Sequence, residues 1–115
     1  MKLRFIDSSL HGIIDYLAAI ALIAGPFLLN LGSSSPMAIW LSEGTGIAVI
    51  LVSILTNYKF SLFKAIPFSL HLLIDLLAAT AFVAIPFLFA LTGLDAAYYF
   101  VNSAVVYLVV AFTQE

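Results

Sequence analysis

Four apolar segments, each long enough to cross a bilayer, are the feature that most constrains the fold of this chain. They cover residues 9–31, 37–56, 69–91 and 96–113. The hydrocarbon core of a bilayer is about 30 Å thick, and about 20 helical residues span it. Inside lipid every backbone polar group needs a partner within its own segment, which a helix of this length provides. The sequence therefore predicts an all-α polytopic membrane protein with four transmembrane helices.

The composition excludes a water-soluble fold. Of the 115 residues, 64% are hydrophobic and 9% are charged, whereas a soluble domain has about 45–50% apolar and about 25% charged residues. Little chain remains outside the four segments, so we expect no soluble catalytic domain and no enzyme. The chain has no cysteine, which excludes thiolate metal sites, and its few cations make no surface for nucleic acid. The expected partners are membrane lipids and, because four short helices bury little volume, a homo-oligomer or a larger membrane complex.

The distribution of cations predicts the topology. Two cations precede the first segment and two lie between the second and third: Lys2, Arg4, Lys59 and Lys64. The connections at 32–36 and 92–95 contain neither Lys nor Arg. Since short cytoplasmic segments carry an excess of Lys and Arg, both termini and residues 57–68 are expected in the cytoplasm. The predicted location is the cell inner (plasma) membrane, as a multi-pass protein.

The first segment is nearly repeated sixty residues later. Residues 9–31 and 69–91 are identical at 14 of 23 aligned positions, with a histidine, an aspartate and a proline in register. The same shift, without a gap, aligns residues 37–53 with 97–113, where only one valine is shared. The repeated unit is therefore predicted to be a hairpin of two helices.

The repeat predicts how the chain is organised. We expect one membrane domain, 1–115, made of repeat 1 at 7–56, a cytoplasmic loop at 57–66 and repeat 2 at 67–115. Because each repeat contains two spans, both copies enter the membrane from the same side. They are then parallel repeats, related by a pseudo-twofold axis along the membrane normal.

Several motifs of the two hairpins resemble the SPW repeat family of small bacterial integral membrane proteins. The matching parts are Pro26 to Leu29, the stretch "SSPMAIW" with Trp40, Gly46, and Pro86 to Leu88. The second copy departs from the pattern, with Phe100 in place of Trp40 and Val106 in place of Gly46. The resemblance implies a membrane-embedded repeat fold and no particular biochemical activity.

A histidine and an aspartate four residues apart stand in each copy of the repeated segment. They are His11 with Asp15, and His71 with Asp75. A spacing of four places each pair on one helix face, and the repeat places both pairs at the same depth. Ionisable residues within a membrane face the bundle interior and pair with one another. The four side chains are therefore expected to meet near the axis.

Such a cluster allows several functions. Two imidazoles and two carboxylates are ligands of zinc and similar divalent metals, while two histidines alone could hold a haem. A proton relay is a third reading, because intramembrane Asp and His mark such paths. A structural interpretation is that the Asp–His pairs only lock the helix bundle together. In a variant of it, a shallow histidine is simply hydrated by water among the lipid headgroups. No lysine lies within a span, so a retinal Schiff base is not available.

Glu43 is the other acidic residue placed within a predicted span. It lies at the depth of Pro26, and a helical proline leaves the carbonyl four residues before it, that of Leu22, without a donor. We expect a protonated Glu43 to donate to that carbonyl or to a water beside it; alternatively, Glu43 forms the outer end of a proton path. The corresponding residues of the second repeat are Asn102 or Ser103, beside Pro86 and the carbonyl of Phe82.

Overall fold

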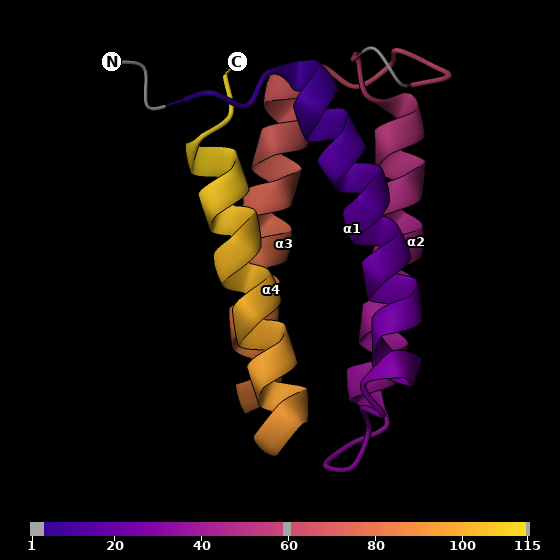
Figure 1. The fold of residues 1–115 in the computed structure, drawn as a ribbon, viewed down its shortest axis with the longest axis vertical. Helices are drawn as coiled ribbons and strands as arrows, with labels where there is room; N and C mark the ends of the chain where they lie inside the picture. Colours follow the sequence, from indigo (N-terminus) through magenta and orange to yellow (C-terminus); the bar gives the residue numbers. More distant parts are fainter. Residues whose placement is uncertain (1–3, 59–60, 115) are drawn as a thin grey trace.

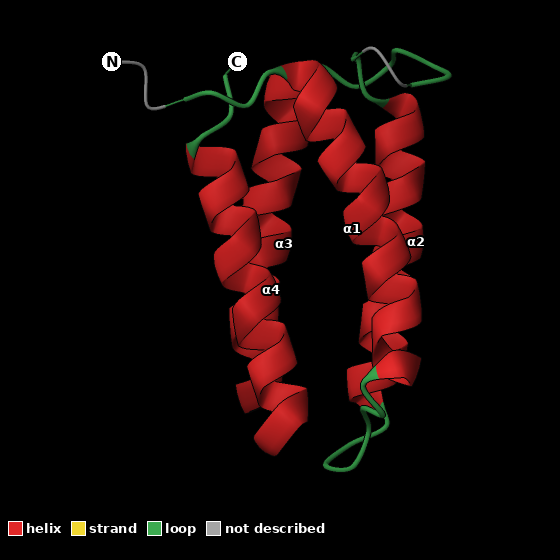
Figure 2. Cartoon of the chain, in the orientation of Figure 1, coloured by secondary structure: helices red, strands yellow, loops and turns green. Residues whose placement is uncertain are grey.

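The computed structural model describes residues 4–58 and 61–114, and this part of the chain is helical (Figures 1 and 2). Its helices are α1 Ser8–Leu28, α2 Met37–Leu55, α3 Phe68–Leu88 and α4 Gly93–Ala111. All four are long and apolar enough to cross a membrane. The predicted all-α fold, with four helices long and apolar enough to span a membrane, is thereby confirmed. Lys2 and Lys59, two of the cations used to predict the topology, lie outside the described residues.

The four helices form two hairpins, since α1 packs against α2 and α3 packs against α4. The hairpins stand side by side (Figure 1). Both chain ends and the α2–α3 connection lie at one end, here called the terminal end. The two connections within the hairpins lie at the opposite end, here called the turn end.

Helices α1 and α3 end in the same way. Asn30 and Ala90 each adopt φ of 53°, a left-handed conformation that reverses the chain. The residue after each donates its N–H to the carbonyl of Pro26 or Pro86, at 2.9 and 2.8 Å, a bond typical of helix C-termini. The two prolines therefore lie in the last turn of their helices, where their carbonyls help to close the chain reversal.

Helix α4 begins earlier than the sequence predicts. The predicted span 96–113 is wrong at its start, because α4 begins at Gly93. The connection from α1 to α2 covers 29–36, whereas that from α3 to α4 covers only 89–92. An ungapped shift of sixty therefore misaligns the second helices of the two hairpins.

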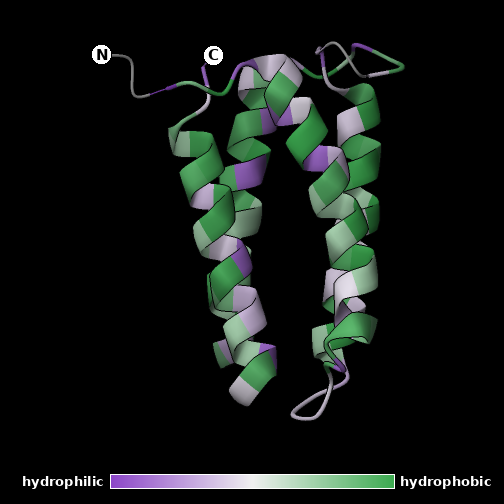
Figure 3. Cartoon of the chain, in the orientation of Figure 1, coloured by the Kyte–Doolittle hydropathy of each residue, from purple (hydrophilic) through white to green (hydrophobic). Residues whose placement is uncertain are grey.

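Apolar side chains fill the turn half of the molecule and cover its outside. A buried cluster joins the hairpins there, made of Leu22, Leu31, Ala38, Phe82, Ile85, Leu91, Tyr98 and Tyr99. The helices also carry many exposed Leu, Ile, Val and Phe side chains, and hydrophobic residues line all four helices in Figure 3. An exposed apolar surface of this extent suits lipid as the surrounding solvent.

Two hydroxyl contacts supplement this cluster. The Tyr98 hydroxyl lies 2.7 Å from the Ser42 Oγ, and the Tyr99 hydroxyl donates to the carbonyl of Ala38 at 2.6 Å. Both contacts join α4 to α2, so they fix one hairpin against the other at the turn end.

Candidate metal centre

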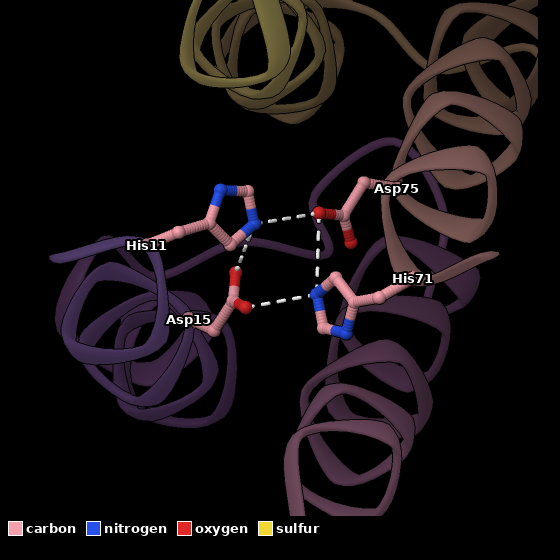
Figure 4. Close-up of side chains that lie close together, drawn as sticks. All are labelled: His11, Asp15, His71 and Asp75. Atoms are coloured by element: carbon pink, nitrogen blue, oxygen red, sulfur yellow. Dashed lines mark hydrogen bonds and ion pairs between the residues drawn. The ribbon is translucent and has the colours of Figure 1, made fainter. Parts of the chain in front are cut away.

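At the terminal end, His11 and Asp15 of α1 face His71 and Asp75 of α3 (Figure 4). We call these four residues the His/Asp quartet. The His11 Nε2 lies 2.9 Å from Asp75 and 3.3 Å from Asp15, and the His71 Nε2 lies 2.8 Å from Asp15 and 3.3 Å from Asp75. Each imidazole thus touches the carboxylate of its own helix and that of the opposite hairpin. The expectation that the four residues meet is confirmed.

A threonine fixes the outer nitrogen of each imidazole. The Nδ1 of His11 lies 2.9 Å from the Thr113 Oγ1, and the Nδ1 of His71 lies 2.7 Å from the Thr56 Oγ1. Both hydroxyls donate their only hydrogen to a carbonyl four residues earlier in the helix. Towards the imidazole each hydroxyl can therefore only accept, so each Nδ1 carries a hydrogen and each Nε2 faces the carboxylates.

With this tautomer, the centre of the quartet is stable only if it holds positive charge. A bare Nε2 lone pair at 2.8–2.9 Å from a carboxylate oxygen would be repelled by it. The four residues are buried or nearly so, with His11 at 0% and Asp15 at 7% exposure. In such surroundings unpaired charge is costly. Two protons or one divalent cation at the centre would each balance the two carboxylates.

The contacts of the quartet are not all good hydrogen bonds. The His11 Nε2 and the Asp75 Oδ2 satisfy hydrogen-bond geometry at 2.9 Å. The His71 Nε2 is buried and lacks a well-directed hydrogen bond, although the Asp15 Oδ2 is only 2.8 Å away. Its ring nitrogen is therefore not directed at this carboxylate oxygen.

The dimensions suit a tetrahedral metal ion. Zinc bonds of about 2.0–2.2 Å to nitrogen and oxygen place neighbouring ligand atoms about 3.3–3.6 Å apart. Ligand atoms of the four residues lie within 4.8 Å of one another, and the His–Asp contacts run from 2.8 to 3.3 Å. An ion would require the two short contacts to open and the more distant ligand atoms, within 4.8 Å of one another, to move closer.

Haem does not fit between the two histidines. Their ring centroids are only 5.4 Å apart and the rings are nearly perpendicular. The carboxylates occupy the space beside both Nε2 atoms (Figure 4), where a porphyrin plane would have to lie. The haem alternative is therefore not supported by the site.

Two aromatic side chains close the quartet at the terminal end. Tyr58, in the α2–α3 connection, is 4% exposed, and its ring centroid lies 5.6 Å from that of His71. The ring of Phe68 lies 5.3 Å from that of His11. We call Tyr58 and Phe68 the aromatic cap. Gly12 packs closely against it, since a Cβ at this position would lie 3.4 Å from the Tyr58 ring.

Tyr58 also acts on Asp15. Burial, and then the nearby Asp15 carboxylate, raise the pKa of Tyr58 above its ordinary value. The hydroxyl therefore stays protonated and donates to the Asp15 Oδ2 at 3.3 Å. Lys64 donates to the Tyr58 carbonyl at 2.6 Å and helps to hold this residue in place.

The expected direct hydrogen bond from Glu43 to the carbonyl of Leu22 is wrong. The carbonyl of Leu22 accepts its hydrogen bond from the Ser42 Oγ at 2.7 Å, and the buried Glu43 Oε1 has no hydrogen-bond partner. Ser42 is fully buried against α1, so its short hydroxyl reaches the carbonyl that the proline leaves without a donor.

The second repeat also differs from the prediction. Ser103 donates to the carbonyl of Ala79 at 2.7 Å, not to that of Phe82. Asn102 donates to the carbonyl of Tyr98 within its own helix at 2.8 Å. Neither side chain therefore has the expected contact near Pro86.

Sequence reasoning missed the residues that support the quartet. Thr56 and Thr113 are 57 positions apart. When the second helices of the two hairpins are aligned with a shift of 57 residues, four positions are identical, whereas the shift of sixty gives one identity. An alignment of the two repeats that allowed a three-residue gap would have paired Thr56 with Thr113. Tyr58 has no counterpart in the repeat, because the loop that carries it occurs once.

Asp95 was missed as well. It is fully buried in the first turn of α4, and its carboxylate accepts from the backbone N–H groups of Gly32 and Ser34 at 2.8 and 2.9 Å. It also accepts from the Ser34 hydroxyl. This single side chain therefore anchors the α1–α2 connection to the other hairpin.

The chain matches no protein-family model, no curated protein and no solved structure. The resemblance to the SPW repeat family therefore stays a prediction, and the functional conclusion must come from the geometry of the site.

Proposed function

We propose that this small membrane protein binds one divalent transition-metal ion, of the kind represented by zinc, at the His/Asp quartet. The observation that supports this most is the threonine-fixed tautomer of both histidines. Metal-bound histidines characteristically donate their other ring N–H to an oxygen, which orients the ligating nitrogen. In the quartet both Nε2 atoms are aimed inward in this way, from opposite hairpins.

The charge of the site is compatible with a bound divalent ion. Two neutral imidazoles, two carboxylates and one divalent cation sum to zero. A neutral site is favoured where water is scarce, because isolated charges are costly there. Nitrogen and oxygen ligands together suit zinc and other first-row divalent ions better than calcium or magnesium, which prefer oxygen alone.

A structural lock is the second candidate. It is favoured by the well-formed contact between the His11 Nε2 and the Asp75 Oδ2 at 2.9 Å. In that case both imidazoles are protonated, and the four charges hold α1 and α3 together without an ion. Both candidates predict that the quartet stabilises the fold, so metal content must decide between them.

The deciding experiment is the metal content of protein purified in detergent, then exposed to zinc and freed of excess by gel filtration. We expect one ion per chain by mass spectrometry, and none in a His11→Asn/His71→Asn double variant. Asp7→Asn is the matched control, since Asp7 caps α1 at an exposed position and asparagine caps equally well. Loss of the ion to a chelator should also lower the melting temperature of the wild type. If the wild-type protein takes up no metal under these conditions, the metal-binding proposal is refuted and the structural lock is the remaining candidate.

The architecture leads to further proposals. The contacts of Thr56 with Ile66 and of Thr113 with Ile6 match one another, which supports parallel repeats related by a pseudo-twofold axis. The excess of Lys and Arg supports a cytoplasmic terminal end in an inner (plasma) membrane. The exposed apolar faces support membrane lipids and further copies of the chain as partners. We propose no enzymatic role, since little of the described chain lies outside the four helices.

A further inference from the structure

A cavity lies beside the His/Asp quartet, on the side away from the aromatic cap. It has a volume of about 100 Å³ and walls from all four helices, and we call it the central cavity. Asp15 and Asp75 form its wall next to the quartet, and Leu22 and Phe82 form its wall further towards the turn end. Seven helical residues separate Asp15 from Leu22, which corresponds to about 10 Å along the helix. The cavity therefore has room for about three water molecules or for a small guest of similar volume.

The charge of this wall is concentrated at one end. Asp15 and Asp75 are the only charged residues that line the central cavity, and most of the other lining residues are apolar. Both imidazole contacts of Asp75 use its Oδ2, so its Oδ1 takes part in no contact of the quartet (Figure 4). The Asp75 side chain is also 17% exposed, whereas those of both histidines are 1% exposed. One carboxylate oxygen is therefore left for a guest.

The uncharged polar groups of the wall also accept hydrogen bonds. Thr45 and Ser103 each donate the hydroxyl hydrogen to a backbone carbonyl at 2.7 Å, so only lone pairs remain for a guest. Asn102 donates one amide hydrogen to the carbonyl of Tyr98 and is the one side chain of the wall that keeps a polar hydrogen as well as an acceptor. This wall is therefore satisfied best by a guest that supplies hydrogen-bond donors.

A small alkylammonium ion has the properties that this wall requires. Its ammonium group carries three donors and no acceptor, and its charge is opposite to that of the two carboxylates. Its alkyl group is apolar, like the wall between the carboxylates and Phe82. Burying an ammonium group without a partner is costly, and the Asp75 Oδ1 provides a partner at the charged end of the cavity. Water would satisfy the acceptors but would leave the charge of the carboxylates unbalanced.

We propose that the central cavity binds a small primary alkylammonium ion, with the ammonium group at Asp15 and Asp75 and the alkyl group directed towards Leu22 and Phe82. The proposal is supported by the position of two carboxylates at one end of an otherwise mostly apolar cavity. It goes beyond the metal binding proposed above and does not depend on it. Since a metal ion would use the same carboxylates, the alkylammonium ion is a ligand of the metal-free protein.

The proposal can be tested with propylammonium, for which 1-propanol is a neutral counterpart of nearly the same size and shape. Protein purified in detergent is treated with a chelator and titrated with each compound by isothermal titration calorimetry, in an excess of potassium chloride. We expect one propylammonium ion per chain, bound at least about tenfold more tightly than propanol, because a charged hydrogen-bonded pair is stronger than a neutral one. Equal affinity for the two compounds, or no saturable binding of propylammonium, would refute the proposal.

Three variants locate the site. Ala78→Leu fills the central cavity from α3 without altering a carboxylate and should abolish saturable binding of propylammonium. Asp75→Asn keeps the shape of the side chain, removes its charge and should lower the affinity at least about tenfold. The matched control is Ala104→Leu, which should bind propylammonium as the wild type does, because Ala104 is exposed on α4 and does not line the cavity.

A second cavity-filling variant keeps the test decisive if Ala78→Leu does not fold. Val106→Phe fills the same cavity from α4 and should likewise abolish binding. Wild-type affinity in a folded cavity-filling variant would exclude the central cavity as the site. Because these titrations use metal-free protein, they are independent of the zinc measurement. A chain that binds propylammonium but no zinc refutes only the metal proposal, and a chain that binds zinc but no propylammonium refutes only this one.

Discussion

Replacing the threonine behind each histidine tests the metal centre most directly. Thr113 and Thr56 are both fully buried, and each accepts a hydrogen bond from one imidazole Nδ1. Thr113→Val and Thr56→Val keep the branched shape and remove only the hydroxyl. The ligating atoms of the quartet are not altered, so any effect on metal binding comes from the support of the imidazole.

The expected magnitude follows from the lost acceptor. A buried N–H without a partner costs about 1–3 kcal/mol, and the imidazole can avoid this cost only by rotating or changing tautomer. Removing such a supporting group typically lowers metal affinity about 10–100-fold, which corresponds to about 1.4–2.8 kcal/mol. The two contacts have similar lengths, 2.9 and 2.7 Å, so the two variants should lose similar affinity.

The assay is a competition titration of zinc between the purified protein and a chelating dye of known affinity. The control is Thr80→Val, because Thr80 is exposed and its hydroxyl contacts Leu76 and Tyr107, away from the quartet. We expect the wild-type affinity for the control and a 10–100-fold loss for each test variant. If both test variants bind zinc within twofold of the control, the threonines do not orient the histidines and the tautomer argument is wrong.

Three other predictions concern stability and can be checked by unfolding in a graded series of detergent mixtures. Asp95→Ala should lower the free energy of unfolding by about 2–4 kcal/mol, because it leaves buried donors without an acceptor. Gly46→Ala should cost about 1–3 kcal/mol, since its Cβ would lie 2.7 Å from an isoleucine side chain, whereas Gly44→Ala meets nothing within 4 Å and should not destabilise. Ser42→Ala should destabilise by about 1 kcal/mol or more, and Glu43→Leu should not, because only the serine satisfies the freed carbonyl.

The proximity of the four quartet residues was predictable, because a polar side chain on a helix surrounded by lipid has few favourable positions. A carboxylate and an imidazole within an apolar helix must face the interior, and a spacing of four keeps each pair on one side. The repeat then places His11 and His71 at equal depth. These constraints act within single helices or between two copies of one segment, so sequence reasoning reaches them.

The supporting contacts were not predictable in the same way. Thr113 meets His11 across 102 positions, and Asp95 meets Gly32 across 63. Such pairs depend on how long each connection is, and the gap in the repeat lies in the turn, where no residue pattern marks it. Tyr58 belongs to a loop, whose conformation follows from its contacts and not from a hydrophobic period.

The charge of the quartet links its stability to its function. Two carboxylates must be balanced by two protons or by one divalent ion, and both arrangements join α1 to α3. They differ in geometry, because a shared proton favours contacts near 2.8–2.9 Å, whereas a tetrahedral ion favours about 3.3–3.6 Å. The quartet has two contacts of each kind. Binding an ion would therefore widen the two short contacts by about half an ångström. A cavity of about 100 Å³ bordered by Asp15 and Asp75 lies directly beside them, so the hairpins have space to make this adjustment without breaking the contacts at the turn end.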